Sequence, residues 1–363
     1  MKNGTETHET VPLPGRIVVS SRVRLARNLD GQPFPGWAKK SERVAILESI
    51  QAAVRDLPQM KDGICQTMDT LSQIEKQVLV EKHLISREHA GRNIGSGVAI
   101  DKKAAISVMI NEEDHIRMQA ILPGFKLPDV YGAIDQVDSA LARKLIFAFS
   151  PALGFLTACP TNVGTGMRAS AMLHLPALRL NDHIGKIIQA VNKLGLTVRG
   201  LYGEGTEALG DLFQISNQTS LGEKEADILH RLGKVIGEIV RHEQNARLTL
   251  LEKTPRLMYD HIGRAYGILT TARTITSKET MNQLSMINLG VDLGFFKGLD
   301  LAMTGELFEV TQPAHLQQNH SNQRMSAEDR DGLRADFIRG KLEKIPGPVF
   351  PAIPPPRAGK NDE

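Results

Sequence analysis

Ala104-Ala105-Ile106-Ser107-Val108-Met109-Ile110 is an apolar run that ends abruptly at Asn111-Glu112-Glu113-Asp114-His115-Ile116-Arg117, a segment with three acids, a histidine and an arginine. The first half predicts a buried strand. Neighbouring carboxylates repel one another and resist removal from water, so the fold must place cations or a cationic substrate beside them. The second half therefore predicts a site for a positively charged group.

The fold around this strand is predicted to be α+β. A polar turn at Lys102-Lys103 separates the strand from the apolar segment 97–101, which favours an antiparallel hairpin. Further strands are predicted at 16–20, 64–68, 155–158, 197–200 and 212–216, and helices at 41–57, 71–85, 130–147, 168–175, 183–194 and 223–251. We expect a central, largely antiparallel sheet flanked by helices.

The last third of the chain, from about Thr254, has a different pattern. From about Thr254 onward the strand signals vanish, and helices are predicted at 257–269, 278–293 and 328–342. The last residues are rich in proline, which predicts disorder. The expected organisation is a flexible tail at 1–15, a first domain at 16–251, an all-α domain at 252–343 and a disordered tail at 344–363.

The composition excludes several classes of protein. With 44 basic and 41 acidic residues the net charge is only +3, which disfavours a nonspecific nucleic-acid binder. Cys65 and Cys159 are too few for a disulfide framework or a four-cysteine zinc site. No stretch predicts a membrane span or a signal peptide. We expect a cytoplasmic protein.

Arginines follow the first strand in Ser20-Ser21-Arg22-Val23-Arg24. If the strand continues through them, its alternation places Arg22 and Arg24 on one face, where they suit a polyanion. A solvated edge strand carrying protective charges would explain the same residues.

Two glycine-rich segments also carry arginines. Cys159-Pro160-Thr161-Asn162-Val163-Gly164-Thr165-Gly166-Met167-Arg168 is predicted to join a strand to a helix, a geometry that suits phosphate, although it matches neither a Walker loop nor a dinucleotide fingerprint. Arg199-Gly200-Leu201-Tyr202-Gly203-Glu204 places an acid between glycines. A structural or surface turn is the alternative in both cases.

Together, these four segments, in this order, resemble the catalytic domain of the phosphagen (guanidino) kinases over roughly 16–251. The resemblance implies a glutamine-synthetase-like fold with ATP, Mg²⁺ and a guanidinium acceptor. Creatine and arginine kinases carry a helical domain before the Ser-Arg-Val-Arg segment, whereas only residues 1–15 precede Arg16 here. The helical domain after 251 instead resembles the bacterial protein-arginine kinases of the McsB type, which mark proteins for the Clp protease.

The resemblance also implies roles for residues. A guanidinium needs a carboxylate to orient it and accept its proton, and Glu113 is expected to do so, with Glu204 as the second acid and Glu112 and Asp114 in support. Cys159 matches the reactive cysteine of the family and is expected to assist at the substrate site, with its pKa lowered by a helix N-terminus. The expected phosphate-binding arginines are Arg22, Arg24, Arg117, Arg168 and Arg199.

The rest of the nucleotide site follows by matching position. His83 is expected to lie beside the adenine, and no metal is expected to be bound directly, since Mg²⁺ arrives with ATP. The other residues expected to line ATP are Ser20, Ser21, Val23, Ala169, Ser170, Ala171, Met172, Gly200, Leu201, Tyr202, Gly203 and Glu204.

Arg330-Asp331-Gly332-Leu333-Arg334-Ala335 reads in isolation as an exposed helix face with a local counter-ion. The resemblance instead implies an allosteric phosphoarginine pocket. It further implies protein substrates, an activator protein, Clp partners and a homodimer. A kinase of small guanidines and a catalytically dead phosphoarginine adaptor remain as alternatives.

Overall fold

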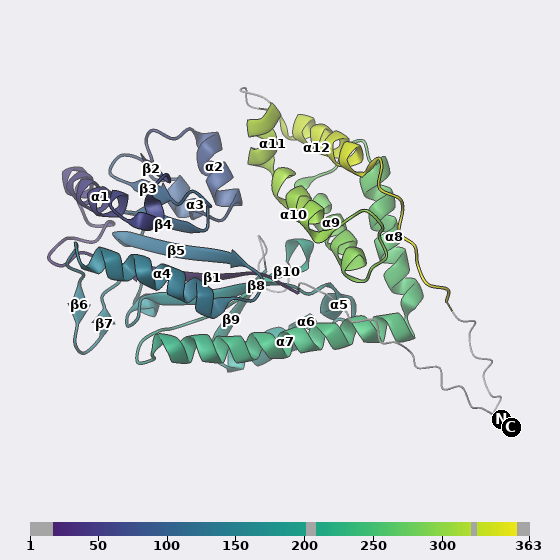
Figure 1. Ribbon diagram of the computed structural model, residues 1–363, viewed down its shortest axis with the longest axis horizontal. Coiled ribbons are helices and arrows are strands. Elements are labelled where there is room, and N and C mark those ends of the chain that lie inside the picture. The colour runs from purple at the N-terminus through teal and green to yellow at the C-terminus, as the bar shows by residue number, and fades with distance from the viewer. Residues whose placement is uncertain (1–16, 201–207, 321–324, 354–363) are drawn as a thin grey trace.

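Eight strands form one sheet in the order β2-β3-β4-β5-β1-β8-β10-β9 within the residues that the computed structural model describes, 17–200, 208–320 and 325–353 (Figure 1). Every neighbouring pair in this sheet is antiparallel. Its strands are β1 (Val18–Arg27), β2 (Ile64–Thr67), β3 (Gly97–Ile100), β4 (Ile106–Ile110), β5 (Ile116–Pro123), β8 (Met167–His174), β9 (Leu196–Gly200) and β10 (Leu212–Asn217). The expected antiparallel sheet is confirmed, including the hairpin of β3 and β4.

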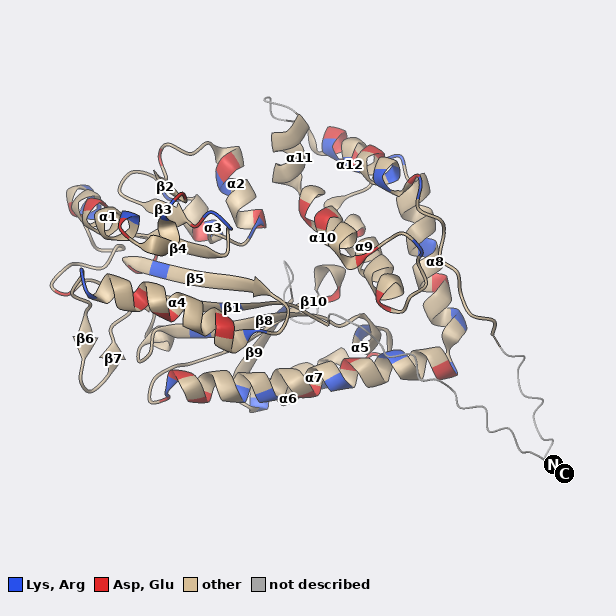
Figure 2. Cartoon of the chain, in the orientation of Figure 1, with Lys and Arg blue, Asp and Glu red and all other residues tan. Residues whose placement is uncertain are grey.

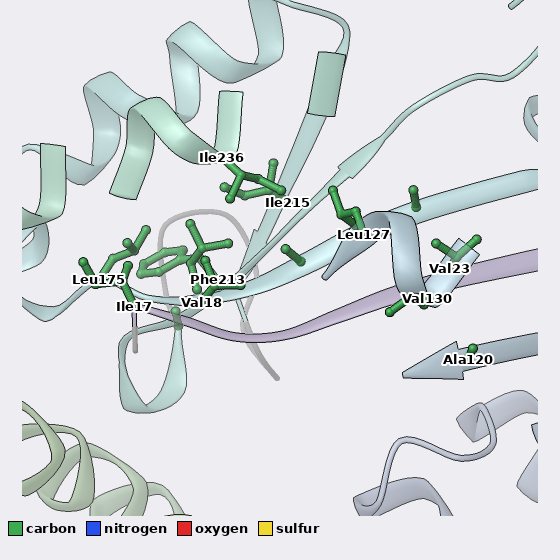
Figure 3. Close-up of a cluster of buried hydrophobic side chains, with 14 of the residues drawn as sticks. Ile17, Val18, Val23, Ala120, Leu127, Val130, Leu175, Phe213, Ile215 and Ile236 are labelled. Carbon is green, nitrogen blue, oxygen red and sulfur yellow. The ribbon is translucent and has the colours of Figure 1, made fainter. Parts of the chain in front are cut away.

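One face of the sheet is apolar. Val23 lies opposite Ala120 on one side and Ala169 on the other, and all three side chains are buried. Helices α4 (Leu127–Ala142) and α7 (Glu225–Lys253) pack on this face, with Leu127, Val130 and Ile236 pointing into it (Figure 3). Since residues three to four apart lie on one side of a helix, such spacing gives each helix a stripe that the sheet buries.

The remaining helices and turns of the first part frame this sheet. They are α1 (Lys40–Arg55), α2 (Gln73–Glu81), α3 (Arg87–Ala90), α5 (Pro176–Leu180), α6 (Ile184–Lys193) and the 3₁₀ turns η1 (Pro58–Met60), η2 (Pro160–Asn162) and η3 (Leu209–Asp211). A second apolar cluster joins Val80 and Leu84 to Val98 and Met109, on the face opposite α4 and α7. Around β2, β3 and β4 that face is therefore covered as well.

The C-terminal part is helical, as expected. It consists of α8 (Pro255–Thr271), α9 (Ser277–Asp292), α10 (Leu301–Val310), α11 (Pro313–His320) and α12 (Ala327–Leu342). Figure 1 shows these helices stacked beside one end of the sheet, with α11 next to α2. Buried polar contacts join the two parts, since Arg247 of α7 pairs with Glu243 at 2.8 Å and with Asp292 of α9 at 3.0 Å.

Part of the expected disordered tail has defined contacts. Phe350 stacks on Tyr259 with ring centroids 4.6 Å apart, and the backbone N–H of Val349 donates to the carbonyl of Phe295. An aromatic ring in this proline-rich segment thus has apolar surface to bury against α8, which composition alone does not show.

The expected helix at 168–175 is wrong, because Met167–His174 is the strand β8. Methionine, alanine and leucine favour helices, but β8 lies between β1 and β10 and finds hydrogen-bonding partners on both sides. The glycine turn before it therefore joins a short hairpin to a strand, not a strand to a helix. In that hairpin the expected strand at 155–158 shrinks to β7 (Gly154–Phe155), paired with β6 (Phe149–Ser150).

Other boundaries also differ from those predicted. Helix α2 ends at Glu81, and His83 has a left-handed backbone with φ of 58°, so it is not the helical residue that the periodicity suggested. Strand β5 and helices α10 and α11 were not predicted. None of the described helices is both long enough and apolar enough to span a bilayer.

Candidate active site

The polar face of the central strands carries the predicted arginines. Arg24 of β1 lies directly opposite Arg168 of β8, and opposite Gln119 of β5 on its other side. Arg22 lies two residues from Arg24 on β1, and Arg117 lies two residues from Gln119 on β5. Both therefore project from the same face as Arg24. Arg199 of β9 is opposite Gln214 of β10, and β9 lies two strands from β8, with β10 between them. We call this surface the arginine face. Figure 2 shows Lys and Arg on these otherwise tan strands.

The electrostatics of the arginine face call for an anion. Burial and the charges of Arg117 and Arg168 lower the pKa of Arg22 to about 10. Burial and the charges of Arg22, Arg117 and Arg168 likewise lower the pKa of Arg24 well below its ordinary value. Within the described residues, neither makes an ion pair, and Nε of Arg24 is buried without a hydrogen-bond partner. Unpaired half-buried cations are costly, so a bound polyanion would stabilise them.

The acid segment forms a tight loop between β4 and β5. Asp114 is buried and accepts hydrogen bonds at 2.7 Å from the side chain of Asn28 and from the backbone N–H of Ala158. Asn111 has φ of 55° and donates to the carbonyls of Arg43 and Gly95. These contacts fix the loop against four other segments of the chain.

Two neighbouring glutamates in this loop have different environments. Glu112 is buried and pairs with Arg117 at 2.7 Å, and it also accepts from the hydroxyl of Ser86. Burial alone would raise the pKa of Glu112, but the charge of Arg117 and these hydrogen bonds lower it. Glu113 is 45% exposed and 3.9 Å from Arg117, and burial with the charge of Asp114 raises its pKa. Glu113 is thus the more exposed and less tightly paired of the two carboxylates.

A cavity of about 660 Å³ brings Glu113 and the arginines together. Its lining includes three arginines, Arg24, Arg117 and Arg199, and two acids, Glu112 and Glu113. Loop residues Phe34 and Trp37 form its edge, and the Trp37 side chain is 88% exposed. Anion-binding and cation-binding groups therefore face one space.

A second cavity, of about 370 Å³, lies along the same strand toward the start of β1. Ser20 and Met172, which are register partners on β1 and β8, line it together with His83. Burial, with the charge of Arg22, lowers the pKa of His83 to about 4, so this ring is neutral at physiological pH. Three of the predicted nucleotide residues thus meet in a mostly apolar space.

Comparison with known proteins agrees with this geometry. The family profile "ATP:guanido phosphotransferase, C-terminal catalytic domain" matches residues 45–246, and "Protein-arginine kinase McsB C-terminal domain" matches residues 255–352. A protein-arginine kinase of Halothermothrix orenii is 44% identical over 326 residues, which are 90% of this chain and 93% of that protein. The chain belongs to the protein-arginine kinase family. A Bacillus subtilis member is 44% identical over 328 residues, 90% of each chain.

Solved structures of other kinases share the fold of this chain. Lombricine kinase superposes with a TM-score of 0.57 and 25% identity over 65% of this chain and 67% of that one. The duplicated taurocyamine kinase from Schistosoma mansoni with bound transition state analog components gives 0.55 and 26% identity over 63% of this chain and 32% of that one. The shared guanidino kinase fold confirms the expected fold class.

Not every expected ATP residue of this kinase faces the site. Ser21, Val23, Ala169 and Ala171 point to the apolar face and are buried there, and Ser21 donates to the carbonyl of Gly124. Their side chains cannot reach a ligand on the arginine face. Ser170 and Met172 alternate with them and project from the arginine face, while Gly200 ends β9. Leu201, Tyr202, Gly203 and Glu204 lie outside the described residues.

Cys159 lies near the arginine face but not at the expected helix start. It precedes η2, a single 3₁₀ turn, and its Sγ is 3.1 Å from the hydroxyl of Thr161. Its neighbour Ala158 lines the larger cavity and is tied to Asp114. The cysteine is therefore next to a residue of the larger cavity, but it does not precede the α-helix that the sequence predicted.

Several residues of the larger cavity were not predicted. Ser86 holds Glu112, and Nη2 of Arg92 donates to the carbonyl of Glu112 at 2.8 Å. Glu88 and Trp37 also line the cavity, and no sequence pattern marks Glu88. A lone, exposed tryptophan in a loop after the arginine strand was the available signal.

The segment 330–335 occupies the first half of α12. Arg334 is buried and donates to the carbonyls of Thr311 and Ile275 and to Asp331, and burial lowers its pKa. Arg330 donates to the carbonyl of Met325 at 2.7 Å. Arg334 therefore joins α12 to two other segments, a structural role that its sequence pattern did not suggest.

Among the described residues, no group of three or more histidine, cysteine or acidic side chains could hold a metal ion. Glu112 is already engaged with Arg117 and Ser86.

Proposed function

We propose that this kinase transfers the γ-phosphoryl group of ATP to the guanidinium of arginine side chains in proteins. One observation carries the proposal: the half-exposed Glu113 and the arginine face line the same cavity. A carboxylate attracts the acceptor and cations attract the donor, so the two reactants meet between them. Transfer between charged partners depends mainly on such positioning and charge neutralisation.

The arginine face is proposed to hold the triphosphate. Arg22, Arg24, Arg168 and Arg199 make no ion pair among the described residues, which leaves their guanidinium groups for phosphate oxygens. Arg117 is close to the carboxylates of both Glu112 and Glu113. It is therefore proposed to lie between the phosphate donor and the guanidinium acceptor. Mg²⁺, bound through the phosphates, would supply further positive charge to the transferring group.

Glu113 is proposed to accept the proton. A bond forms between a guanidinium nitrogen and the γ-phosphorus, the bond from that phosphorus to the β,γ-bridging oxygen breaks, and the nitrogen proton passes to the Glu113 carboxylate. ADP leaves. The raised pKa of Glu113 makes it a stronger base than an ordinary glutamate. Glu204, outside the described residues, is proposed as the second acid on the guanidinium.

A protein acceptor is favoured over a small guanidine by two observations. The matched C-terminal family profile is that of protein-arginine kinases. The cavity also opens beside Trp37, whose exposed ring offers apolar surface to a polypeptide flanking the target arginine. Free arginine has no such flanking chain.

We also propose for this kinase the other roles that the resemblance implies. Residues 330–335 are proposed to hold phosphoarginine as an allosteric ligand, since Nη2 of Arg334 makes no hydrogen bond among the described residues. We also propose a homodimer, an activator protein, and Clp partners downstream. A cytoplasmic location fits two unpaired cysteines.

The test is mass spectrometry of phosphoarginine after a protein mixture is incubated with this kinase and Mg-ATP. We expect acid-labile phosphate on protein arginines. Label that enters only added free arginine would support the small-guanidine alternative. Binding of phosphoarginine without any transfer would support the adaptor.

A further inference from the structure

The smaller cavity has two walls from different parts of the chain. One wall belongs to the sheet and the turn after α2, and the other to helices α9 and α10. The residues that the argument uses are Ser20, His83 and Met172 on the first wall and Met281, Asn288 and Phe308 on the second. The cavity of about 370 Å³ is therefore completed by the C-terminal helical part.

Its position along β1 relates it to the phosphate site. Ser20 lines the cavity, and Arg22 and Arg24 follow at alternate positions on the same face of the strand. Two residues along a strand span about 7 Å. A nucleotide that lies along β1 with its phosphates on the arginines thus extends its base toward this cavity.

The lining suits a flat heteroaromatic ring. Phe308 and Met172 supply apolar surface from opposite walls, and the amide of Asn288 and the hydroxyl of Ser20 supply hydrogen-bonding groups. Apolar walls with a few oriented polar groups are typical of small-molecule sites. A sugar or a free phosphate would leave most of this apolar lining without a partner.

The polar group on the helical wall is held in place. Oδ1 of Asn288 accepts from the hydroxyl of Thr304 at 2.8 Å, and its Nδ2 lies 3.4 Å from Nδ1 of His174. His174 in turn contacts Ser285, whose hydroxyl donates to Asp211. Because Asn288 is already oriented, it can offer its remaining amide hydrogen to a ligand without rearrangement.

The two walls are also joined at their outer edge. The carboxylate of Glu81, two residues before His83, accepts from the backbone N–H groups of Ala314 and His315 at the start of α11. Nδ1 of His315 lies 2.7 Å from the same carboxylate. Helix α11 is thus fixed to the segment that carries His83, and the cavity keeps its width.

We propose that the C-terminal helical part supplies one wall of the purine-base site, with Phe308 packed on the base and Asn288 at its polar edge. The inference rests on the proposed ATP-dependent transfer. The new element is that the nucleotide contacts both the catalytic part and the C-terminal helical part of the chain. Nucleotide affinity then depends on helices that lie outside the matched catalytic profile.

Binding of ATP and of tripolyphosphate to the full chain, measured by titration calorimetry, tests this assignment. Phe308→Ala is expected to weaken ATP by about tenfold, the effect of losing a buried aromatic contact, and to leave tripolyphosphate unchanged. Arg24→Ala should weaken both ligands. Phe350→Ala, which removes an aromatic ring that packs on α8 and does not line the cavity, should change neither.

A second variant keeps the test decisive if Phe308→Ala does not fold. A Cβ built on Gly305, which lines the cavity from α10, meets no atom within 4 Å. Gly305→Leu should therefore fold, because leucine favours helices, and fill the cavity. It is expected to weaken ATP and spare tripolyphosphate.

The inference is overturned if both variants bind ATP like the wild type, or if they lose ATP and tripolyphosphate equally. Failure of the proposed function looks different. In that case the wild type would bind ATP but place no phosphate on protein arginines, and the comparison of the two ligands would still decide whether the helical wall contacts the base.

Discussion

The carboxylate of Glu112 and the guanidinium of Arg117 form an ion pair of 2.7 Å across the loop that joins β4 to β5. Because Glu112 takes this cation, its neighbour Glu113 is left 3.9 Å from the same guanidinium and 45% exposed. One acid thus stabilises the loop while the next faces the cavity. Adjacent residues of one type acquire different chemistry from the partners that the fold gives them.

Replacement of Glu113 tests its role as the base. Glu113→Gln keeps the shape of the side chain but cannot accept a proton, so kcat for phosphoarginine formation should fall by roughly 10²- to 10⁴-fold. Circular dichroism and ATP binding should stay as in the wild type. Glu88→Gln alters another acid of the same cavity and is the matched control. A Glu113→Gln rate within twofold of the wild type would exclude proton transfer to this residue.

The pH dependence of the reaction reports the same group. Glu113 must be ionised to accept a proton, and its pKa is raised above the ordinary 4.5 by burial and the charge of Asp114. Activity should therefore be lost, as pH falls, at a higher pH than for an ordinary glutamate. Initial rates of kcat/KM between pH 4.5 and 8 would show this acid limb. If an active Glu113→Asp variant showed the same loss of activity at the same pH midpoint, a group other than Glu113 would be responsible for that loss.

The stability of the folded protein should depend on pH through Glu112, whose pKa is lowered, whereas the pKa of Glu113 is raised. Its folded-state pKa is lowered below 4.5, so its ionised form contributes stability above that value, and the contribution is lost as pH falls through the folded pKa. Glu112→Gln should lower the free energy of unfolding at pH 7, and the gap from the wild type should close in acid. Urea titrations at several pH values would measure it. A gap that is independent of pH would point to packing alone.

How far the sequence determines this site can be judged from particular residues. Alternation along one strand correctly placed Arg22 and Arg24 together, yet the same alternation sends Ser21 and Val23 to the opposite face. Family resemblance selects a segment, whereas strand geometry selects every second residue within it. The arginine face could thus be predicted from the sequence. Which of the neighbouring residues share that face could be decided only from the register of the strands.

Other features depend on partners that are distant in sequence. β8 has the composition of a helix and is a strand only because β1 and β10 flank it. Strand β5 begins at Ile116, inside the segment that was interpreted only as a charged site. Trp37, Ser86 and Arg92 come from separate segments and line the same cavity as Glu113, and no local pattern predicts that they meet there.

Arg24 illustrates a conflict between function and stability. Its charge is unfavourable where burial and three other arginines surround it, so Arg24→Ala should raise the melting temperature of the nucleotide-free protein by about 2 °C. The same change should weaken ATP by at least about tenfold through the loss of a charge-assisted contact. Differential scanning calorimetry with and without ATP measures both effects. A lower melting temperature without ATP would show that Arg24 has a stabilising partner instead.

Trp37 should matter for the acceptor and not for the donor. Its ring is 88% exposed at the edge of the cavity, so burying it under a polypeptide would recover apolar surface that the free protein leaves in water. Trp37→Ala is expected to raise KM for a protein substrate by about tenfold, with KM for ATP and the melting temperature unchanged. Ile146→Ala removes another apolar side chain, 79% exposed and absent from the cavity lining, and should have no effect on either KM. Equal losses for the protein substrate and for ATP would show that Trp37 supports the cavity as a whole and does not contact the acceptor.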